Sequence, residues 1–296
     1  MTGSAIDAAL ARRMVLVRTV TFGYAAAWLV VRARYVWNVA GLPERRFEPV
    51  GLLTLMDWQP GRLVVMTVAT VTLAAAVLAT VGRYVAVAAP VAAVGMLLIA
   101  TLTSSFGQVF HTEHLLVLHL LVLAAYAVAT ARPSADRVWG ARWAIGMLGA
   151  VTAVTYVVAG VAKLRMSGFD WVSGDVLRNW VAIDNLRKLL LDDPYSPVGG
   201  ALAGVGWVWP PIAAATLLVE LGAPLAVLVR RVAVPWVVAA WAFHVGVLAV
   251  MAISFPYQLT GVAYLALLPA ERIEARVRSL LRRPPTYTRS TCRNSC

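Results

Sequence analysis

Residues 84–103 read YVAVAAPVAAVGMLLIATLT, a stretch that contains no charged side chain. A helix of about 20 apolar residues is long enough to cross the hydrocarbon core of a bilayer. The same composition runs through the 296 residues of the chain, which are 60% hydrophobic and 14% charged, whereas soluble domains carry about 25% charged residues. The sequence therefore predicts an integral membrane protein and excludes a pair of soluble domains.

Apolar windows of this kind recur along the chain, and we expect an all-α, polytopic bundle of about eight transmembrane helices. This transmembrane domain covers residues 1–269, and residues 270–296 form a basic cytoplasmic tail. The expected spans are Met14–Val31, Leu63–Val81, Tyr84–Thr103, Val109–Ala131, Trp143–Leu164, Val205–Val229, Val232–Ser254 and Phe255–Pro269.

The net charge of +12 reflects an excess of arginine, since only Lys163 and Lys188 among the 26 basic residues are lysines. In a membrane chain, such charges orient loops and touch anionic lipid, so we expect no nucleic-acid partner. Arginines gather at alternate span boundaries, which with eight spans places both termini of this multi-pass protein in the cytoplasm. These clusters are Arg12 and Arg13, Arg83, Arg132 to Arg142, Arg230 and Arg231, and the tail from Arg272.

An amphipathic helix is predicted over Val172–Leu191, where apolar residues recur at helical spacing between charged ones. It lies on the exterior side of the membrane, at the interface. The two cysteines, Cys292 and Cys296, are confined to the last residues, so neither a disulfide framework nor a metal-thiolate site organises the core.

Lys163 and Glu220 are ionisable residues inside or at the end of expected spans, where charge is costly and tends to mark function. Lys163 has two interpretations: its side chain extends to the membrane interface, or it is a buried amine that acts as a base. Gly160, one turn earlier, leaves room for a partner helix or a substrate. Glu220 must be neutral or paired, and Lys163 is one of its candidate partners.

Histidines form the second polar group. His111 and His114 share a helix face at the exterior start of a span, whereas His119 turns away. Two histidines alone do not make a zinc site, and Glu113 can serve as a helix cap. His244 lies mid-span among aromatic residues. With Lys163, these groups can converge in one cavity in the outer half of the bilayer.

Several segments resemble, in order, the vitamin K-dependent gamma-carboxylase-like membrane domain, also called the HTTM domain. The resemblance covers residues 12–269, and its most specific part is Tyr156-Val-Val-Ala-Gly-Val-Ala-Lys-Leu-Arg165 with Gly168-Phe-Asp-Trp-Val-Ser-Gly174. The other matching segments are Glu113-His114-Leu-Leu, Glu220-Leu-Gly-Ala-Pro224, Phe243-His244 and Ser254-Phe-Pro-Tyr257.

The resemblance implies that Lys163 is the catalytic residue, because the lysine at this position in the carboxylases is held to deprotonate a reduced quinone. It also matches His114 and His244 to the family's membrane histidines. Peptide carboxylases carry a large extramembrane domain that has no counterpart here, so carboxylation of a protein glutamate is not expected. What remains is a membrane chamber suited to an isoprenoid, and related small members resemble terpene cyclases.

Our first functional hypothesis is a membrane terpene cyclase that converts a prenyl diphosphate to a cyclised terpene in an aromatic cavity. Lys163 and Arg165 would clamp the diphosphate, with Mg²⁺ as a candidate cofactor, although no Asp-Asp-x-x-Asp motif is present. Ring faces would stabilise a carbocation. The expected substrate-binding residues are Arg165, Glu220, Tyr156, Trp241, Phe243 and Tyr257.

Two alternatives stay open. One is a quinol-dependent oxygenase or epoxidase in which Lys163 is the base and a reduced quinone the reactant. The other is a non-catalytic lipid-binding membrane subunit, in which Lys163 is structural. The expected partners are membrane lipid and an isoprenoid small molecule, with no protein partner evident.

Overall fold

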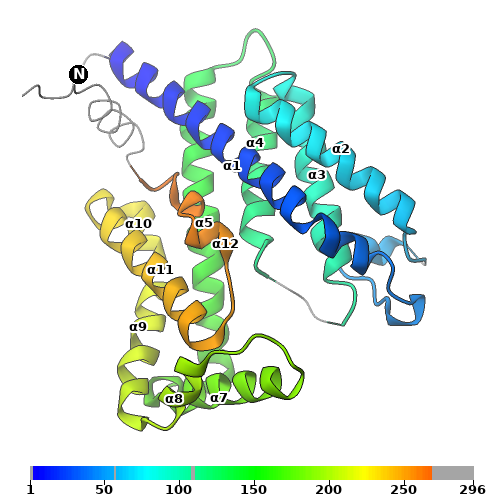
Figure 1. Ribbon diagram of the computed structural model, residues 1–296. Coiled ribbons are helices and arrows are strands. Elements are labelled where there is room, and N and C mark those ends of the chain that lie inside the picture. The colour runs from blue at the N-terminus through cyan, green and yellow to red at the C-terminus, as the bar shows by residue number, and fades with distance from the viewer. Residues whose placement is uncertain (1–2, 57, 108–110, 269–296) are drawn as a thin grey trace, which may run out of the picture.

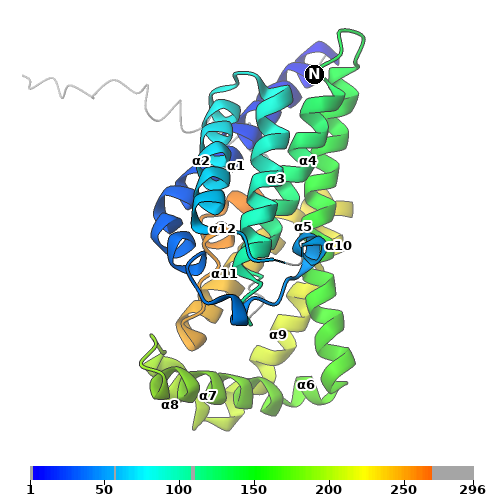
Figure 2. The same cartoon turned by 90° about the vertical axis from the view of Figure 1, so that its right-hand side faces the viewer.

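The computed structural model describes residues 3–56, 58–107 and 111–268. Over these ranges the chain is all-helical and contains no strand, as predicted. Long helices stand side by side, and α7 and α8 lie across one end of the bundle (Figures 1 and 2). The α-helices are α1 (Gly3–Val39), α2 (Arg62–Val81), α3 (Val85–Thr103), α4 (His114–Ala129), α5 (Arg137–Ser167), α6 (Asp170–Ser173), α7 (Asp175–Leu190), α8 (Pro197–Ala203), α9 (Trp209–Leu221), α10 (Ala223–Leu228), α11 (Arg230–Met251) and α12 (Pro256–Leu259). Short 3-10 turns are η1 (Glu44–Arg46), η2 (Gly51–Leu55), η3 (Gly206–Val208) and η4 (Val262–Tyr264).

Five of these helices are long and apolar enough to cross a membrane, namely α1, α2, α3, α5 and α11. The pair formed by α8 and residues 206–221 is bent by 105° and counts as a sixth span if taken as one. Helix α4 is a shorter apolar helix. The chain is therefore a multi-pass membrane protein by length and composition, but continuous helices do not reproduce the predicted count of about eight spans. The predicted basic tail and both cysteines lie outside the described residues.

The expected span Val205–Val229 is broken. It consists of η3, α9 and α10, and the helix is interrupted at Gly222. Pro224 explains the break, because proline has no N–H to donate and its ring clashes with the preceding turn of a helix. Apolarity alone predicted the span, and the proline decided where its helix ends.

The last expected span, Phe255–Pro269, is not a continuous helix in the described residues. We call residues 252–268 the return segment, because it leads from the end of α11 back along the bundle (Figure 1). It contains only the four residues of α12 and the turn η4, separated by Gly261 at a φ of 77°. Irregular backbone is tolerated at membrane depth where it is buried in protein, and Tyr257 and Tyr264 are fully buried.

The start of α1 and the end of the return segment lie at the same end of the bundle. Arg13 of α1 donates hydrogen bonds of 2.6 and 2.7 Å to the carbonyls of Ala266 and Leu268. The assignment of that end to the cytoplasm stays a prediction.

Small residues bring the first helices close together. A Cβ atom on Gly95 of α3 would lie 1.9 Å from the hydroxyl oxygen of Thr72 on α2. The buried face of α3 is rich in alanine. Such faces let helix backbones approach, which is how helices associate where water supplies no hydrophobic driving force.

Candidate functional site

Lys163 and Glu220 form an ion pair between α5 and α9. The side chain of Lys163 is 21% exposed and that of Glu220 is 2% exposed. Gly160 makes the approach possible, since a Cβ there would lie 2.8 Å from Cδ2 of Leu221 and 3.1 Å from Cβ of Glu220. The sequence named Lys163 as one candidate partner of Glu220, and the structure brings the two together. The room left by Gly160 is filled by a partner helix.

Trp171 covers the ammonium group of Lys163. The charged nitrogen lies 5.3 Å from the centroid of the indole ring, within the range of a cation–π interaction. The indole N–H is in turn held by Thr216 Oγ1 at 3.2 Å and by the carbonyl of Ala213 at 3.3 Å. The lysine is thus fixed from two sides, by a carboxylate and by an aromatic face.

A second polar group lies two helical turns before Lys163. The hydroxyl of Tyr156 on α5 is 2.8 Å from Nε2 of His244 on α11 and 2.6 Å from the hydroxyl of Tyr264 in the return segment. Residues seven apart share a helix face, so Tyr156 and Lys163 point the same way. The predicted residues Lys163, Glu220, Tyr156 and His244 therefore gather in one region.

Two buried polar atoms in this region have no hydrogen-bond partner among the described residues. They are Oε2 of Glu220 and Nδ1 of His244. Buried polar groups are nearly always hydrogen-bonded, to protein or to ordered water. The two atoms therefore mark places where a substrate oxygen or a water can bind.

Aromatic rings surround His244 and Tyr156. Phe255 and Phe243 lie 4.8 and 5.0 Å from the His244 ring, and Trp236 lies 5.0 Å from the Tyr156 ring. Phe243, an expected substrate-binding residue, thus lies against His244. Trp236 was not singled out in the sequence, because nothing in its spacing separates it from the many other tryptophans.

His111 comes close to the site but stays exposed. Its ring lies 5.3 Å from the same Phe255 that contacts His244. Partial desolvation, the neighbouring His114 and the charge of Lys163 lower the pKa of His111, and Glu113 opposes them. This histidine is therefore at the edge of the region, on the loop that precedes α4.

Three predicted site residues lie elsewhere. His114 is exposed at the first residue of α4, and Arg165 is exposed two residues after Lys163, on another face of α5. Trp241 is exposed as well, and its indole nitrogen donates to the carbonyl of Leu259 at 2.9 Å. Arg165 therefore does not form a cationic clamp with Lys163 in this arrangement.

His119, which the sequence gave no role, is buried in a separate network. Its Nδ1 lies 2.8 Å from the hydroxyl of Tyr257, and its Nε2 lies 3.0 Å from Oγ1 of Thr152. Tyr257, a predicted substrate-binding residue, is occupied by this contact. The network ties the return segment to α4 and α5. One feature of the sequence does indicate that His119 is buried. It lies more than a full turn further from the start of its helix than His114.

Glu113 does not cap α4 with its side chain. Its carboxylate instead accepts hydrogen bonds from Trp28, at 3.3 Å, and from Thr112. No group of three or more His, Cys, Asp or Glu side chains suited to a metal ion occurs within the described ranges. The acidic and histidine side chains in these ranges therefore do not fit the Mg²⁺ cluster that a diphosphate cyclase would use.

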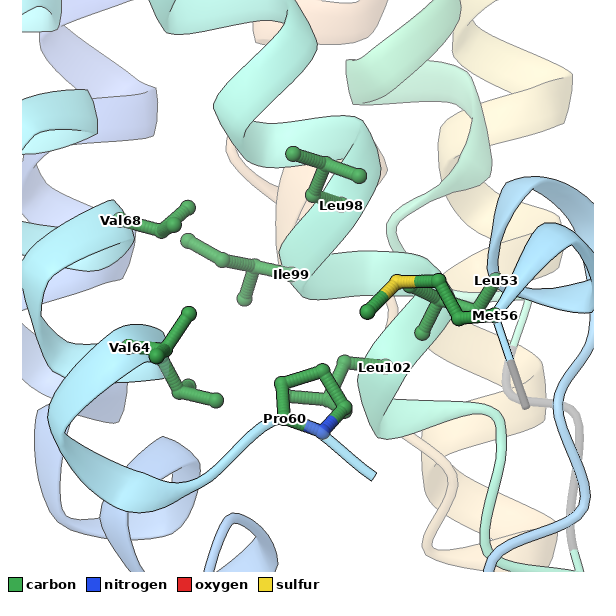
Figure 3. Close-up of a pocket in the computed structure, with 9 residues that line it drawn as sticks. Leu53, Met56, Pro60, Val64, Val68, Leu98, Ile99 and Leu102 are labelled. Carbon is green, nitrogen blue, oxygen red and sulfur yellow. The ribbon is translucent and has the colours of Figure 1, made fainter. Parts of the chain in front are cut away.

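An apolar pocket of about 120 Å³ lies apart from these polar groups, between η2, α2 and α3 (Figure 3). Its lining is wholly aliphatic and carries no titratable group, so it offers no proton-transfer chemistry. The lining residues are Leu53, Met56, Pro60, Val64, Val65, Val68, Leu98, Ile99 and Leu102.

Neither a family model, nor a curated protein, nor a solved structure matches this chain. The resemblance to the gamma-carboxylase-like family therefore rests on the sequence motifs alone.

Proposed function

We propose that this chain is an integral membrane enzyme that acts on an isoprenoid substrate by proton transfer at Lys163 and Glu220. The observation that carries the proposal is the buried ion pair itself. A charged pair inside an apolar bundle costs several kcal/mol of desolvation per ion, and such groups in membrane proteins generally serve function. The neighbouring hydroxyl and imidazole groups of Tyr156 and His244 extend the polar surface toward a bound molecule.

The chemistry follows from the position of the proton between the two side chains. When the proton moves from Lys163 to Glu220, the lysine becomes a neutral amine and the glutamate a neutral acid. The amine can then take a proton from a substrate hydroxyl, which leaves an oxyanion beside a newly formed ammonium group. Low dielectric strengthens that ion pair, and a general base of this type contributes about 10²–10⁴-fold to a rate.

This geometry favours deprotonation of a membrane quinol over clamping of a diphosphate. An anion clamp needs cationic charge that is not already compensated, whereas Lys163 is paired and Arg165 is exposed on another face. A quinol presents a weakly acidic hydroxyl on an apolar isoprenoid tail, and the site offers a base inside an apolar bundle. Under this proposal the oxidant of the quinol is molecular oxygen.

Cyclisation of a prenyl diphosphate is the second candidate, and the aromatic rings favour it. Tyr156, Trp236 and Tyr264 contact one another with centroid separations of 5.0 and 6.1 Å. Faces of such rings stabilise cations by about 0.5–2 kcal/mol each. Lys163 would then remove the final proton from the carbocation rather than bind the diphosphate.

The test is turnover by purified protein in lipid nanodiscs, with mass spectrometry of the products. One arm receives a reduced quinone and oxygen, and the other receives prenyl diphosphates of increasing length, with and without Mg²⁺. Lys163→Ala should abolish turnover in whichever arm is active, and His244→Ala should impair it severely. Lys163→Arg should also be inactive, since arginine stays protonated and cannot act as a base.

Arg165→Gln is the matched control. It changes a cation two residues from Lys163 that lies outside the site, so turnover should stay near that of the natural chain. Partial activity of Lys163→Arg together with loss in Arg165→Gln would support the anion clamp instead. Full activity of a folded Lys163→Ala variant would leave the site without a catalytic role and favour a lipid-binding subunit.

A further inference from the structure

In helix α7, polar side chains face the protein and apolar side chains face outward, which is the reverse of an amphipathic helix on a water-soluble protein. The face that packs against the protein buries the polar residues Asn185 and Lys188. The opposite face mainly exposes a stripe of apolar residues at helical spacing, together with Asn179 near the start of the helix and Arg187 at the edge of the face. The stripe consists of Trp180, Ile183, Leu186 and Leu190, which are 55%, 61%, 56% and 75% exposed.

The buried polar residues serve the end of α11. The last carbonyls of a helix have no partner within the helix, and in water they are hydrated. Here Asn185 donates to the carbonyl of Val250 at 2.9 Å, and Lys188 donates to that of Met251. The preceding carbonyl, of Ala249, accepts from Ser196 just before α8. Three consecutive helix-end carbonyls thus each receive a side-chain donor.

The charge of Lys188 is compensated within the same helix. Its ammonium lies 2.8 Å from Asp184 Oδ2, and Arg187 lies 2.9 Å from Oδ1 of the same carboxylate. Burial of Asp184 acts against ionisation, but the hydrogen bonds from Lys188 and Arg187 prevail and lower its pKa. No unpaired charge is therefore placed between α7 and α11.

We propose that α7 and α8 lie within the acyl-chain boundary of the bilayer, with the exposed stripe of α7 in contact with lipid chains. Two independent observations support this placement. Side-chain donors replace water at the end of α11, as backbone groups require where water is absent. The exposed face is mainly apolar, which is favourable against lipid chains and unfavourable against water.

Other exposed apolar side chains occur on the last turn of α5, just before α6, and on the segments that follow α7. Their distribution over several elements favours lipid over a compact protein partner, because lipid chains adapt to a surface of any shape. These side chains are Met166, Phe169, Leu191, Val198 and Trp207. The end of α11 would then lie about 5–10 Å below the phosphate level, the depth at which interfacial helices bury their apolar face.

The experiment measures the accessibility of a nitroxide label on Ile183→Cys. The full chain, with Cys292→Ser and Cys296→Ser, is reconstituted into vesicles of phosphatidylethanolamine and phosphatidylglycerol. Collision rates with oxygen, which concentrates in the acyl region, and with a water-soluble nickel chelate are then compared. Val71→Cys on α2, which is 51% exposed on a candidate span, is the lipid reference. Ser134→Cys, in the exposed polar loop between α4 and α5, is the water reference.

The expected result is an oxygen-to-nickel collision ratio at Ile183 that is several-fold above that at Ser134 and below that at Val71, which lies at the middle of a candidate span. A ratio equal to that at Ser134 would place α7 in water and overturn the proposal. Low collision rates with both reagents, together with dipolar broadening between labels, would show that a second copy of the chain covers the stripe and would equally overturn it. Since none of these readings uses activity, the result is independent of the proposed function.

Discussion

Removing Lys163 while keeping Glu220 should destabilise the protein by about 3–4 kcal/mol at pH 7. Replacement of the lysine by methionine keeps most of the side-chain volume but leaves a carboxylate that is 2% exposed without its partner. The carboxyl group of Glu220 can lose its uncompensated charge by binding a proton. For a glutamate of ordinary pKa near 4.3, neutralisation at pH 7 costs about 3.7 kcal/mol, at about 1.36 kcal/mol per pH unit. Loss of one member of a buried pair typically costs about 3–5 kcal/mol.

Two further variants make the prediction specific to the pair. Glu220→Gln should cost less, about 1–3 kcal/mol, because the amide oxygen of glutamine can still accept a hydrogen bond from Lys163 and the ammonium keeps its contact with Trp171. The double variant Lys163→Met with Glu220→Leu should recover most of the loss, since replacing both members of a buried pair by apolar residues is often neutral. It should nevertheless have no turnover.

The assay is equilibrium unfolding in mixed micelles of dodecylmaltoside and dodecyl sulfate, followed by the fluorescence of the 11 tryptophans. Lowering the pH to 5.5 should shrink the cost of Lys163→Met to about 1.6 kcal/mol, because less free energy is needed to protonate the carboxyl. A cost that is independent of pH, or a double variant as unstable as Lys163→Met, would refute the assignment of a compensated buried charge.

Three further predictions concern packing, the buried histidine and the interfacial acid. Gly160→Ala should destabilise the protein by about 1–3 kcal/mol, because its Cβ would collide with α9, whereas Gly146→Ala, with open space around it, should stabilise it by about 0.5–1 kcal/mol. In the same unfolding assay, His119→Phe should cost about 1–3 kcal/mol through the loss of its two buried hydrogen bonds, to Tyr257 and Thr152. Exposed His114→Phe should stay within about 0.5 kcal/mol, and equal costs would contradict the buried network. The lowered pKa of Asp184 should contribute stability above pH about 4, and this stability is lost as the pH falls through the folded-state pKa. The difference in unfolding free energy between the natural chain and Asp184→Asn should therefore vanish in acid. A difference that does not change with pH would contradict the ion pairs of Asp184.

The parts of the fold that the sequence predicted are those where apolarity alone decides. A charge-free stretch such as Tyr84–Thr103 can satisfy its backbone in lipid only as a helix, and α3 covers almost the same residues. The amphipathic spacing of Val172–Leu191 likewise predicted α7, although Gly174, at a φ of 85°, divides the segment.

Hydropathy could not predict the return segment. The transfer free energy of Phe255–Pro269 resembles that of a span, but Pro256 and Gly261 oppose a continuous helix. Buried tyrosine hydroxyls then tie the irregular backbone to polar groups on other helices. Those partners lie more than a hundred positions away in the chain, so no local pattern reveals them.

The candidate site was predictable in part. A lysine and a glutamate within spans each demand a partner, which made the pair Lys163 and Glu220 one of a few arrangements. The choice between His114 and His119 depended on the rotation of α4, which spacing alone did not decide. Tyr264 could not be found, because its role comes from a tertiary contact of a segment expected to be a plain span.

The return segment also has a consequence for biogenesis. His119 and Tyr257 are 138 residues apart, so at about 5–20 residues per second the histidine waits about 7–28 s after its own synthesis for its partner. Throughout that interval, buried polar groups on helices already in the membrane are exposed to lipid or to one another. Ribosome-stalled chains that stop before residue 256 should therefore be recognised by membrane quality control and degraded. Chains released with residues 257–268 in place should persist, because the return segment then supplies the partners of the buried polar groups.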